Sequence, residues 1–300
     1  MKALRLEFKG GNPFKPEPAV NDLLYFQRND TEGGSGTKVS RDPYVSAAFY
    51  GEDPRPDIKY STDNGQTFKN WESAYDEEEQ AYVYDTIILG NNGDKVLFKG
   101  VNERFSTAES GFNFITQGTG IEAGGSVTSL LDGDGVTLQS IPDYAFKSLF
   151  SYTNITKAPS LGNVTSIGKS GCLGMFSYCK NIHEAANMDN VQTIGTKGCE
   201  KMYRNSNVRS AADMKSLTNV MEQGLVDMYN GCRELTSAAD MGGVEVFGQS
   251  AFLGMYGETQ KLVLLEGESL TFEFPNLPVD AGSNTFTTNE QVVEEMKYSK

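Results

Sequence analysis

The chain has 300 residues, of which 38% are hydrophobic and 11% are aromatic, and it contains 32 Gly. This length accommodates two domains of ordinary size, and the composition favours turns and β-structure over long helices. The formal net charge of −14 opposes contact with phosphate backbones, so we expect no nucleic-acid partner. The sequence has no apolar run of about 18 residues, so we expect no membrane insertion.

The N-terminal part, residues 1–138, has the sequence pattern of a β-sandwich-like domain. Leu4, Leu6 and Phe8 alternate with polar residues, as in a half-buried strand. A long polar stretch rich in Pro and Gly follows over residues 10–44. We expect a loop there, which is either a mobile surface loop or an arm that docks on a partner.

Two segments of this domain have the pattern of β-hairpins. In the first, residues 58–60 and 67–68 flank Asp63-Asn64-Gly65, a sequence that accepts positive φ at low cost. In the second, residues 86–89 and 96–98 flank the Gly/Asn-rich segment 90–94. Short strands separated by such turns predict a β-sandwich.

The second half of the chain, residues 139–300, contains an internal repeat with a period of 26 or 27 residues. Five segments align, and each has an apolar residue at its start, five residues later and eight residues later, with an aromatic ring nine residues after the start. The starts are Ile141, Ile167, Ile194, Val220 and Phe247. The aromatic residues are Phe150, Phe176, Tyr203, Tyr229 and Tyr256.

The spacing within each repeat predicts a short helix followed by a strand. Offsets of five, eight and nine residues lie on one helical face. An apolar stretch such as residues 181–186 follows a polar turn and is the predicted strand. One such unit cannot cover its own apolar face, so we expect the units to stack as a solenoid.

A C-terminal cap is expected to close this solenoid. Residues 262–265 and 270–274 have the pattern of two edge strands. Thr288 or Asn289 then begins a last helix that carries Val292, Val293 and Met296. Such a cap prevents the terminal repeat from stacking on another molecule.

The segment from Ile167 to Ile182, with the sequence IGKSGCLGMFSYCKNI, resembles the BspA-like leucine-rich repeats of gut bacteria and their bacteriophages. The resemblance covers about residues 141–265. Residues 60–65 and 93–100 also resemble the domain that often precedes these repeats. The Pro-rich strand segment of the family is present only at Ala158-Pro159, and the later repeats have Ala-Ala at the corresponding place. The resemblance implies a mainly β protein with short helices (α+β), built as a β-sandwich followed by a solenoid of about five repeats.

Residues that carry catalytic or metal chemistry are sparse. His183 is the single histidine, and we interpret it as a surface residue of the predicted strand. The four cysteines, Cys172, Cys179, Cys199 and Cys232, are interpreted as reduced core thiols. A disulfide between Cys172 and Cys199 stays open as an alternative, because these two occupy the same offset in adjacent repeats.

Two acidic segments are also interpreted as structural. Asp132-Gly133-Asp134-Gly135 lacks the next carboxylate of a calcium loop, so a tight turn is the preferred interpretation. The run over residues 76–79 has the pattern of a solvated acidic face. We therefore predict no enzyme, no cofactor and no metal site, with a glycan hydrolase as the least favoured hypothesis.

Two binding functions remain as hypotheses. The first is a bacteriophage virion protein, a part of a head or tail fibre or a decoration on the virion surface, which assembles as a homo-oligomer and contacts other virion proteins or a host surface. It follows from the resemblance and from the lack of a signal peptide over residues 1–8. The second is an exported bacterial surface adhesin that binds a host protein or glycan outside the cell.

Both hypotheses place the contact surface on the predicted strands. The first outward position after the strand anchor differs from repeat to repeat, and we predict that these positions form an exposed row. The row consists of Thr156, His183, Arg209 and Thr236.

Overall fold

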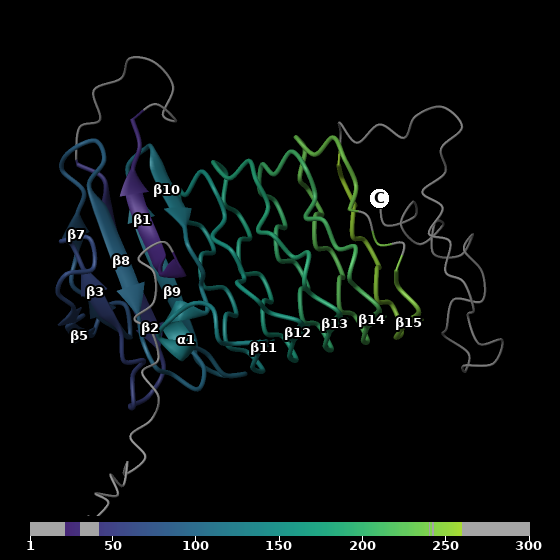
Figure 1. The fold of residues 1–300 in the computed structure, drawn as a ribbon, viewed down its shortest axis with the longest axis horizontal. Coiled ribbons are helices and arrows are strands. Elements are labelled where there is room, and N and C mark those ends of the chain that lie inside the picture. Colours follow the sequence, from purple (N-terminus) through teal and green to yellow (C-terminus); the bar gives the residue numbers. More distant parts are fainter. Residues whose placement is uncertain (1–21, 31–41, 240, 242, 260–300) are drawn as a thin grey trace, which may run out of the picture.

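A computed structural model of the chain describes residues 22–30, 42–239, 241 and 243–259. In these residues the protein is mainly β, as the sequence predicts, and it has a single helix, α1 (Ser129–Asp132). Two antiparallel sheets lie at one end, and five repeats extend from them in a row (Figure 1). The predicted strand at Leu4–Phe8 and the predicted C-terminal cap lie outside the described residues.

The first sheet has the strand order β10-β1-β8-β3-β4. Its strands are β1 (Leu24–Arg28), β3 (Lys59–Ser61), β4 (Lys69–Asn70), β8 (Lys95–Lys99) and β10 (Ile121–Gly124). β1 lies inside the stretch 10–44, so the prediction of a loop is wrong there. Leu24 and Phe26 are buried in the core while Tyr25 and Gln27 are partly exposed, which is the alternation that a strand requires.

The second sheet has the order β5-β6-β2-β7, and a further strand pairs with β2. Its strands are β2 (Tyr44–Tyr50), β5 (Ser73–Asp76), β6 (Ala81–Tyr84), β7 (Ile87–Ile88) and β9 (Gly111–Gln117). The first predicted hairpin is present, because β3 pairs antiparallel with β4, but its second strand begins just after the predicted residues 67–68. The second is wrong: β7 pairs with β2, whereas β8 pairs with β1 and β3 in the other sheet. The turn over residues 90–94 therefore crosses between sheets.

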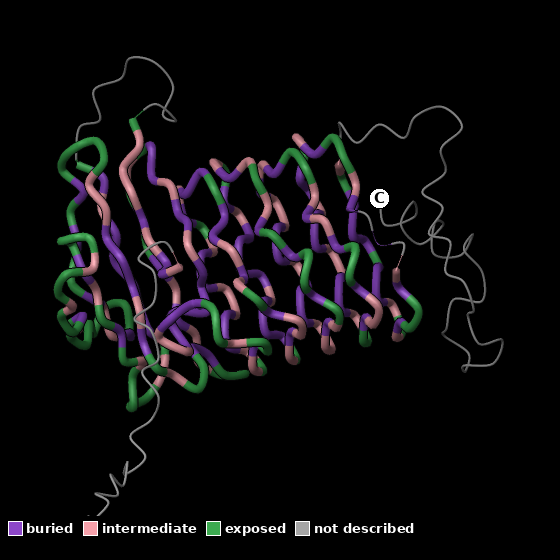
Figure 2. Tube along the Cα trace, in the orientation of Figure 1, coloured by how far each residue is buried: buried purple, intermediate pink, exposed green. Residues whose placement is uncertain are grey.

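Aromatic rings fill the space between the two sheets. Phe26 and Phe98 from the first sheet contact Phe114 of the second, with ring centroids 5.0 and 5.5 Å away. Phe114 also stacks on Phe150 of the first repeat at 5.3 Å and 10°. Its backbone N–H donates to the Leu149 carbonyl at 2.8 Å. One core therefore runs from the sheets into the repeats, and buried residues continue along the chain (Figure 2).

The repeats contact one another through a parallel sheet of two-residue strands. These strands, in spatial order, are β11 (Ser140–Ile141), β12 (Ser166–Ile167), β13 (Thr193–Ile194), β14 (Asn219–Val220) and β15 (Val246–Phe247). The second residue of each strand is buried. The five aromatic residues also stack in order, with ring centroids of successive repeats 5.2–5.7 Å apart. The predicted periodic core is thus present, although its strands lie at the start of each repeat.

The predicted short helices are absent from the described repeats, and a ribbon of consecutive turns takes their place. Within it, alternate N–H groups close turns of their own repeat, as from Leu149 to the Phe146 carbonyl. The intervening N–H groups donate to the next repeat, as from Phe146 to Gly171 at 2.8 Å. Every fourth residue has positive φ, which a type II turn requires but an α-helix does not allow. The prediction of a helix is wrong because the turn ribbon also buries the residues five, eight and nine positions after the start of each repeat.

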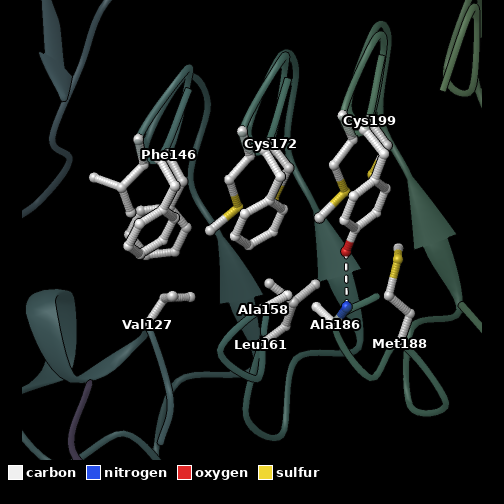
Figure 3. Close-up of a cluster of buried hydrophobic side chains, with 14 of the residues drawn as sticks. Val127, Phe146, Ala158, Leu161, Cys172, Ala186, Met188 and Cys199 are labelled. Carbon is white, nitrogen blue, oxygen red and sulfur yellow. Dashed lines mark hydrogen bonds between the residues drawn. The ribbon is translucent and has the colours of Figure 1, made fainter. Parts of the chain in front are cut away.

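From the second repeat onward, the choice between Phe and Tyr in the aromatic stack follows whether the residue 17 positions earlier has a backbone N–H to donate. The Tyr203 hydroxyl accepts from the Ala186 N–H at 2.8 Å (Figure 3), and Tyr229 and Tyr256 accept in the same way from Ala212 and Ala239. The residue 17 positions before Phe176 is Pro159. Because proline has no N–H group, a ring without a hydroxyl leaves no buried polar atom unpaired there.

Candidate binding surface

The four residues of the predicted row lie side by side in the structure. The His183 N–H donates to the Thr156 carbonyl at 3.1 Å, and Arg209 donates to His183 at 3.1 Å. The Thr236 N–H donates to the Arg209 carbonyl at 2.8 Å. The row thus forms from backbone bonds between repeats, although the segment after it makes only single bridges, such as Lys157 to Glu184, and no continuous strand.

Exposure increases along this row from the sheets outward. Thr156 is buried, at 9% exposed, so the prediction that it is exposed is wrong. The physical reason is that β10 covers it: its N–H and hydroxyl both donate to the Ile121 carbonyl, at 2.9 and 3.4 Å. His183 is half-buried, and Arg209 and Thr236 are exposed. The outward row therefore begins at His183.

An open hollow of about 460 Å³ lies beside His183 and Arg209. Its lining includes the alanines at 185, 186, 211 and 212. Charged and polar residues also line it, and these are His183, Glu184, Asn187, Asp189, Arg209, Ser210 and Asp213. The hollow thus combines small apolar side chains with charges of both signs, which suits contact with a polar partner surface.

The charges near this hollow are partly paired within the protein. Lys157 Nζ lies 3.3 Å from Glu184 Oε2, and this carboxylate raises the pKa of Lys157. Lys215 Nζ lies 2.5 Å from Asp213 Oδ2. Both lysines are at least half exposed, so these pairs leave the surface accessible and contribute little to folding stability.

The cysteines are buried in the repeat core and carry free thiols. Burial raises the pKa of the Cys179 thiol to about 12 and that of Cys232 to about 11. The Cys179 thiol donates to the Phe150 carbonyl at 3.0 Å, and Cys232 donates to Tyr203 in the same way. These thiols are protonated at neutral pH and pack as small apolar groups rather than as nucleophiles.

The carboxylates of Asp132 and Asp134 hold a turn. Asp132 accepts from the N–H groups of Asp134, Gly135 and Leu138 at 2.8–3.0 Å. Asp134 accepts from the N–H of Thr137 at 2.9 Å and from its hydroxyl at 2.7 Å. This agrees with the turn interpretation. Within residues 22–30, 42–239, 241 and 243–259, no cluster of three or more His, Cys, Asp or Glu residues has the geometry of a metal site.

The lining residues outside the row were not predicted from the sequence. Asn187, Asp189 and Asp213 follow the paired alanines by one to three positions. Their signal was present in the repeat alignment, since polar residues recur after Ala-Ala at Asn187 and Asp213. Spacing alone does not show that the alanines leave a hollow.

Comparison with protein-family models, with curated proteins and with solved structures finds no match to this chain. In the part of the chain that the structure describes, no helix has the length and apolarity needed to cross a bilayer.

Proposed function

We propose that the protein is a binding protein that uses its repeats to display a contact surface, and that it serves in a bacteriophage virion. In this proposal the two antiparallel sheets form a β-sandwich, and the repeats form a BspA-like leucine-rich repeat solenoid. The chain is then part of a head or tail fibre or a decoration, and it mediates assembly or attachment to the host surface.

The observation that carries the proposal is that the buried rings of the repeats stay nearly constant while the outward residues of the row change from repeat to repeat. The stacked rings change only between Phe and Tyr. The outward residues His183, Arg209 and Thr236 differ fully in chemistry, although backbone bonds hold them in line. A rigid backbone with differing outward side chains supports a surface made for one partner, and several copies would multiply weak contacts.

The location is tested by immunogold electron microscopy, with an antibody to the purified chain, on phage particles produced by the strain that carries the gene. We expect gold on the head or tail of intact particles. Gold confined to the bacterial envelope would overturn the virion assignment in favour of the adhesin.

The surface is tested with a fluorescent full-length chain and intact cells of the same strain. We expect the double variant His183→Ala/Arg209→Ala to bind these cells at least about tenfold more weakly, because a few central contacts carry most binding energy. Lys59→Ala/Lys69→Ala is the matched control, since both lysines are exposed on the first sheet. Equal binding by the double variant and the parent chain would reject this surface.

A further inference from the structure

The outward side of the turn ribbon in the first three repeats differs in charge from the rest of the protein. We call it the turn face, and it comprises the exposed side chains of residues 142–154, 168–181 and 195–207. These segments contain two acidic residues, Asp143 and Glu200, and six basic ones. The basic residues are Lys147, Lys169, Lys180, Lys197, Lys201 and Arg204. The turn face is therefore positive on a chain whose net charge is −14.

Ion pairs among the described residues engage three of these six cations, namely Lys197, Lys201 and Arg204. Glu200 is 9% exposed and lies 2.6 Å from Lys201 Nζ and 3.9 Å from Lys197 Nζ. The Asp143 carboxylate accepts from the backbone N–H of Lys169 at 2.8 Å. Arg204 Nη1 lies 4.0 Å from Asp227 Oδ2 of the fourth repeat. The side chains of Lys197, Lys201 and Arg204 are 37–44% exposed. A positive patch attracts anions locally even on a protein whose net charge is negative.

Tyrosine rings lie among these cations. Tyr152 stacks on Tyr178 with ring centroids 4.6 Å apart and an interplanar angle of 3°, and Tyr152 is 70% exposed. Lys180 Nζ lies 5.9 Å from the centroid of Tyr178, and Lys169 Nζ lies 5.7 Å from that of Tyr144. Each lysine thus stands beside an aromatic ring on the surface.

Both tyrosines occupy positive-φ positions of the turn ribbon. Tyr152 and Tyr178 have φ of 64° and 61°, where a bulky side chain is strained. The equivalent positions of the next two repeats hold Asn205 and Gly231, which accept this conformation more cheaply. Because every fourth residue of the ribbon has positive φ, Lys197 and Glu258 included, this conformation belongs to the ribbon as a whole.

We propose that the turn face binds an acidic polysaccharide built from carboxylated pyranose sugars. The C–H face of a pyranose ring packs on a flat aromatic ring, and a carboxylate at the sugar's edge then lies where Lys169 and Lys180 flank their tyrosines. The stacked rings of Tyr152 and Tyr178 belong to adjacent repeats, which suits a ligand longer than one sugar. A nucleic acid also combines rings with negative charge, but a duplex has one charge per about 1.7 Å of its axis, so the acidic remainder of the chain repels it more strongly than a polymer with one carboxylate per sugar. This surface is separate from the hollow beside His183 and does not depend on the proposed virion role.

The test is isothermal titration calorimetry of the full-length chain with polygalacturonate, at low and at physiological ionic strength. We expect binding that weakens with salt, and none to the same polymer after its carboxyl groups are reduced to alcohols. Lys169→Gln/Lys180→Gln/Lys197→Gln should weaken binding at least about tenfold, since exposed ion pairs contribute modestly and three are removed. Lys197→Gln copies Gln223, the residue of the fourth repeat at that position.

Matched variants distinguish binding at the turn face from a non-specific effect of the net charge. Tyr152→Asn/Tyr178→Asn copies Asn205, keeps the net charge and should weaken binding by a similar factor. Lys59→Gln/Lys69→Gln/Lys215→Gln removes the same charge elsewhere and should leave binding unchanged. Each variant is first shown to be folded, with a thermal midpoint no lower than that of the parent chain. The proposal is overturned by no binding of polygalacturonate, by equal loss in the control variant, or by tighter binding of a single-stranded oligonucleotide.

Discussion

Aromatic rings form the core of both the two antiparallel sheets and the repeats, but they pack differently in the two regions. Between the sheets, rings meet at varied angles, from 24° for Trp71 on Phe114 to 89° for Phe26 on Phe98. In the repeats, successive rings lie within 11° of parallel. Each ring in the repeats therefore packs against a near copy of itself, whereas each ring in the sheets needs partners from distant parts of the sequence.

This difference makes the repeats sensitive to substitutions at corresponding positions. A ring in the middle of the repeats has neighbours above and below at 5.2–5.7 Å, so a change in one repeat alters the packing of two others. Phe150 belongs to both regions, because it contacts Phe26 and Phe114 on one side and Phe176 on the other. It is where the two kinds of packing join.

The largest effect is expected for Phe150→Ala, which should lower the free energy of unfolding by about 3–5 kcal/mol. Trp71, the single tryptophan, reports on the sheets, and labelling of the four buried thiols reports on the repeats. We expect both signals to shift to the same lower denaturant concentration. The exposed Ile88, changed to Ala, serves as the control. A shift in thiol labelling alone would show that the two regions unfold separately.

A smaller effect is expected from the hydroxyl groups of the ring stack. Tyr229→Phe leaves the buried Ala212 N–H without its acceptor and should cost about 1–3 kcal/mol. Phe176→Tyr should cost a similar amount, because Pro159 offers no donor to the new hydroxyl. Adding Pro159→Ala to Phe176→Tyr should restore part of the loss. Urea unfolding of the single and double variants measures this coupling, and simple addition of the two costs would contradict the pairing rule.

The sequence predicts the repeat core well because one spacing recurs five times. Phe150, Phe176, Tyr203, Tyr229 and Tyr256 lie in one stack, as the alignment requires. The local conformation was wrong because a turn ribbon and a helix both bury offsets of five, eight and nine residues. The ribbon differs from a helix in its positive φ at every fourth residue and in its bonds to the next repeat, and side chains such as Lys197 and Gln223 at the positive-φ positions do not reveal this.

The sheets and the site were less predictable because they depend on contacts between distant residues. The β7–β8 connection has the sequence of a hairpin, yet β7 pairs with β2, which lies some 40 residues earlier in the chain. Likewise, Thr156 occupies the same offset as Arg209, but it is buried because β10 covers the first repeat. A position in a repeat predicts which neighbours align with it, but the end of the stack is covered by a different part of the chain.

The smallest effect is expected at the turn between β3 and β4. Hydrogen bonds to a carboxylate hold this turn, whereas backbone hydrogen bonds hold the turns of the repeats. Asp63 accepts from the Ser61 hydroxyl at 2.6 Å and from the Thr67 hydroxyl and N–H at 2.5 and 2.9 Å, and these bonds lower its pKa to about 2. Because the folded-state pKa lies below the unfolded value of about 3.9, this contribution to stability is present above about pH 4. It is lost as the pH falls towards 2.

Acid should therefore loosen this hairpin while the turn ribbon keeps its bonds, which involve no ionisable group. Carbon-13 NMR of the Asp63 carboxyl group measures its pKa directly. Thr67→Val removes one hydroxyl but keeps the N–H donor, so it should raise the pKa of Asp63 part of the way towards its ordinary value. An Asp63 that already titrates near 4 in the parent chain would show that backbone pairing between β3 and β4 holds this turn, as it does between the repeats.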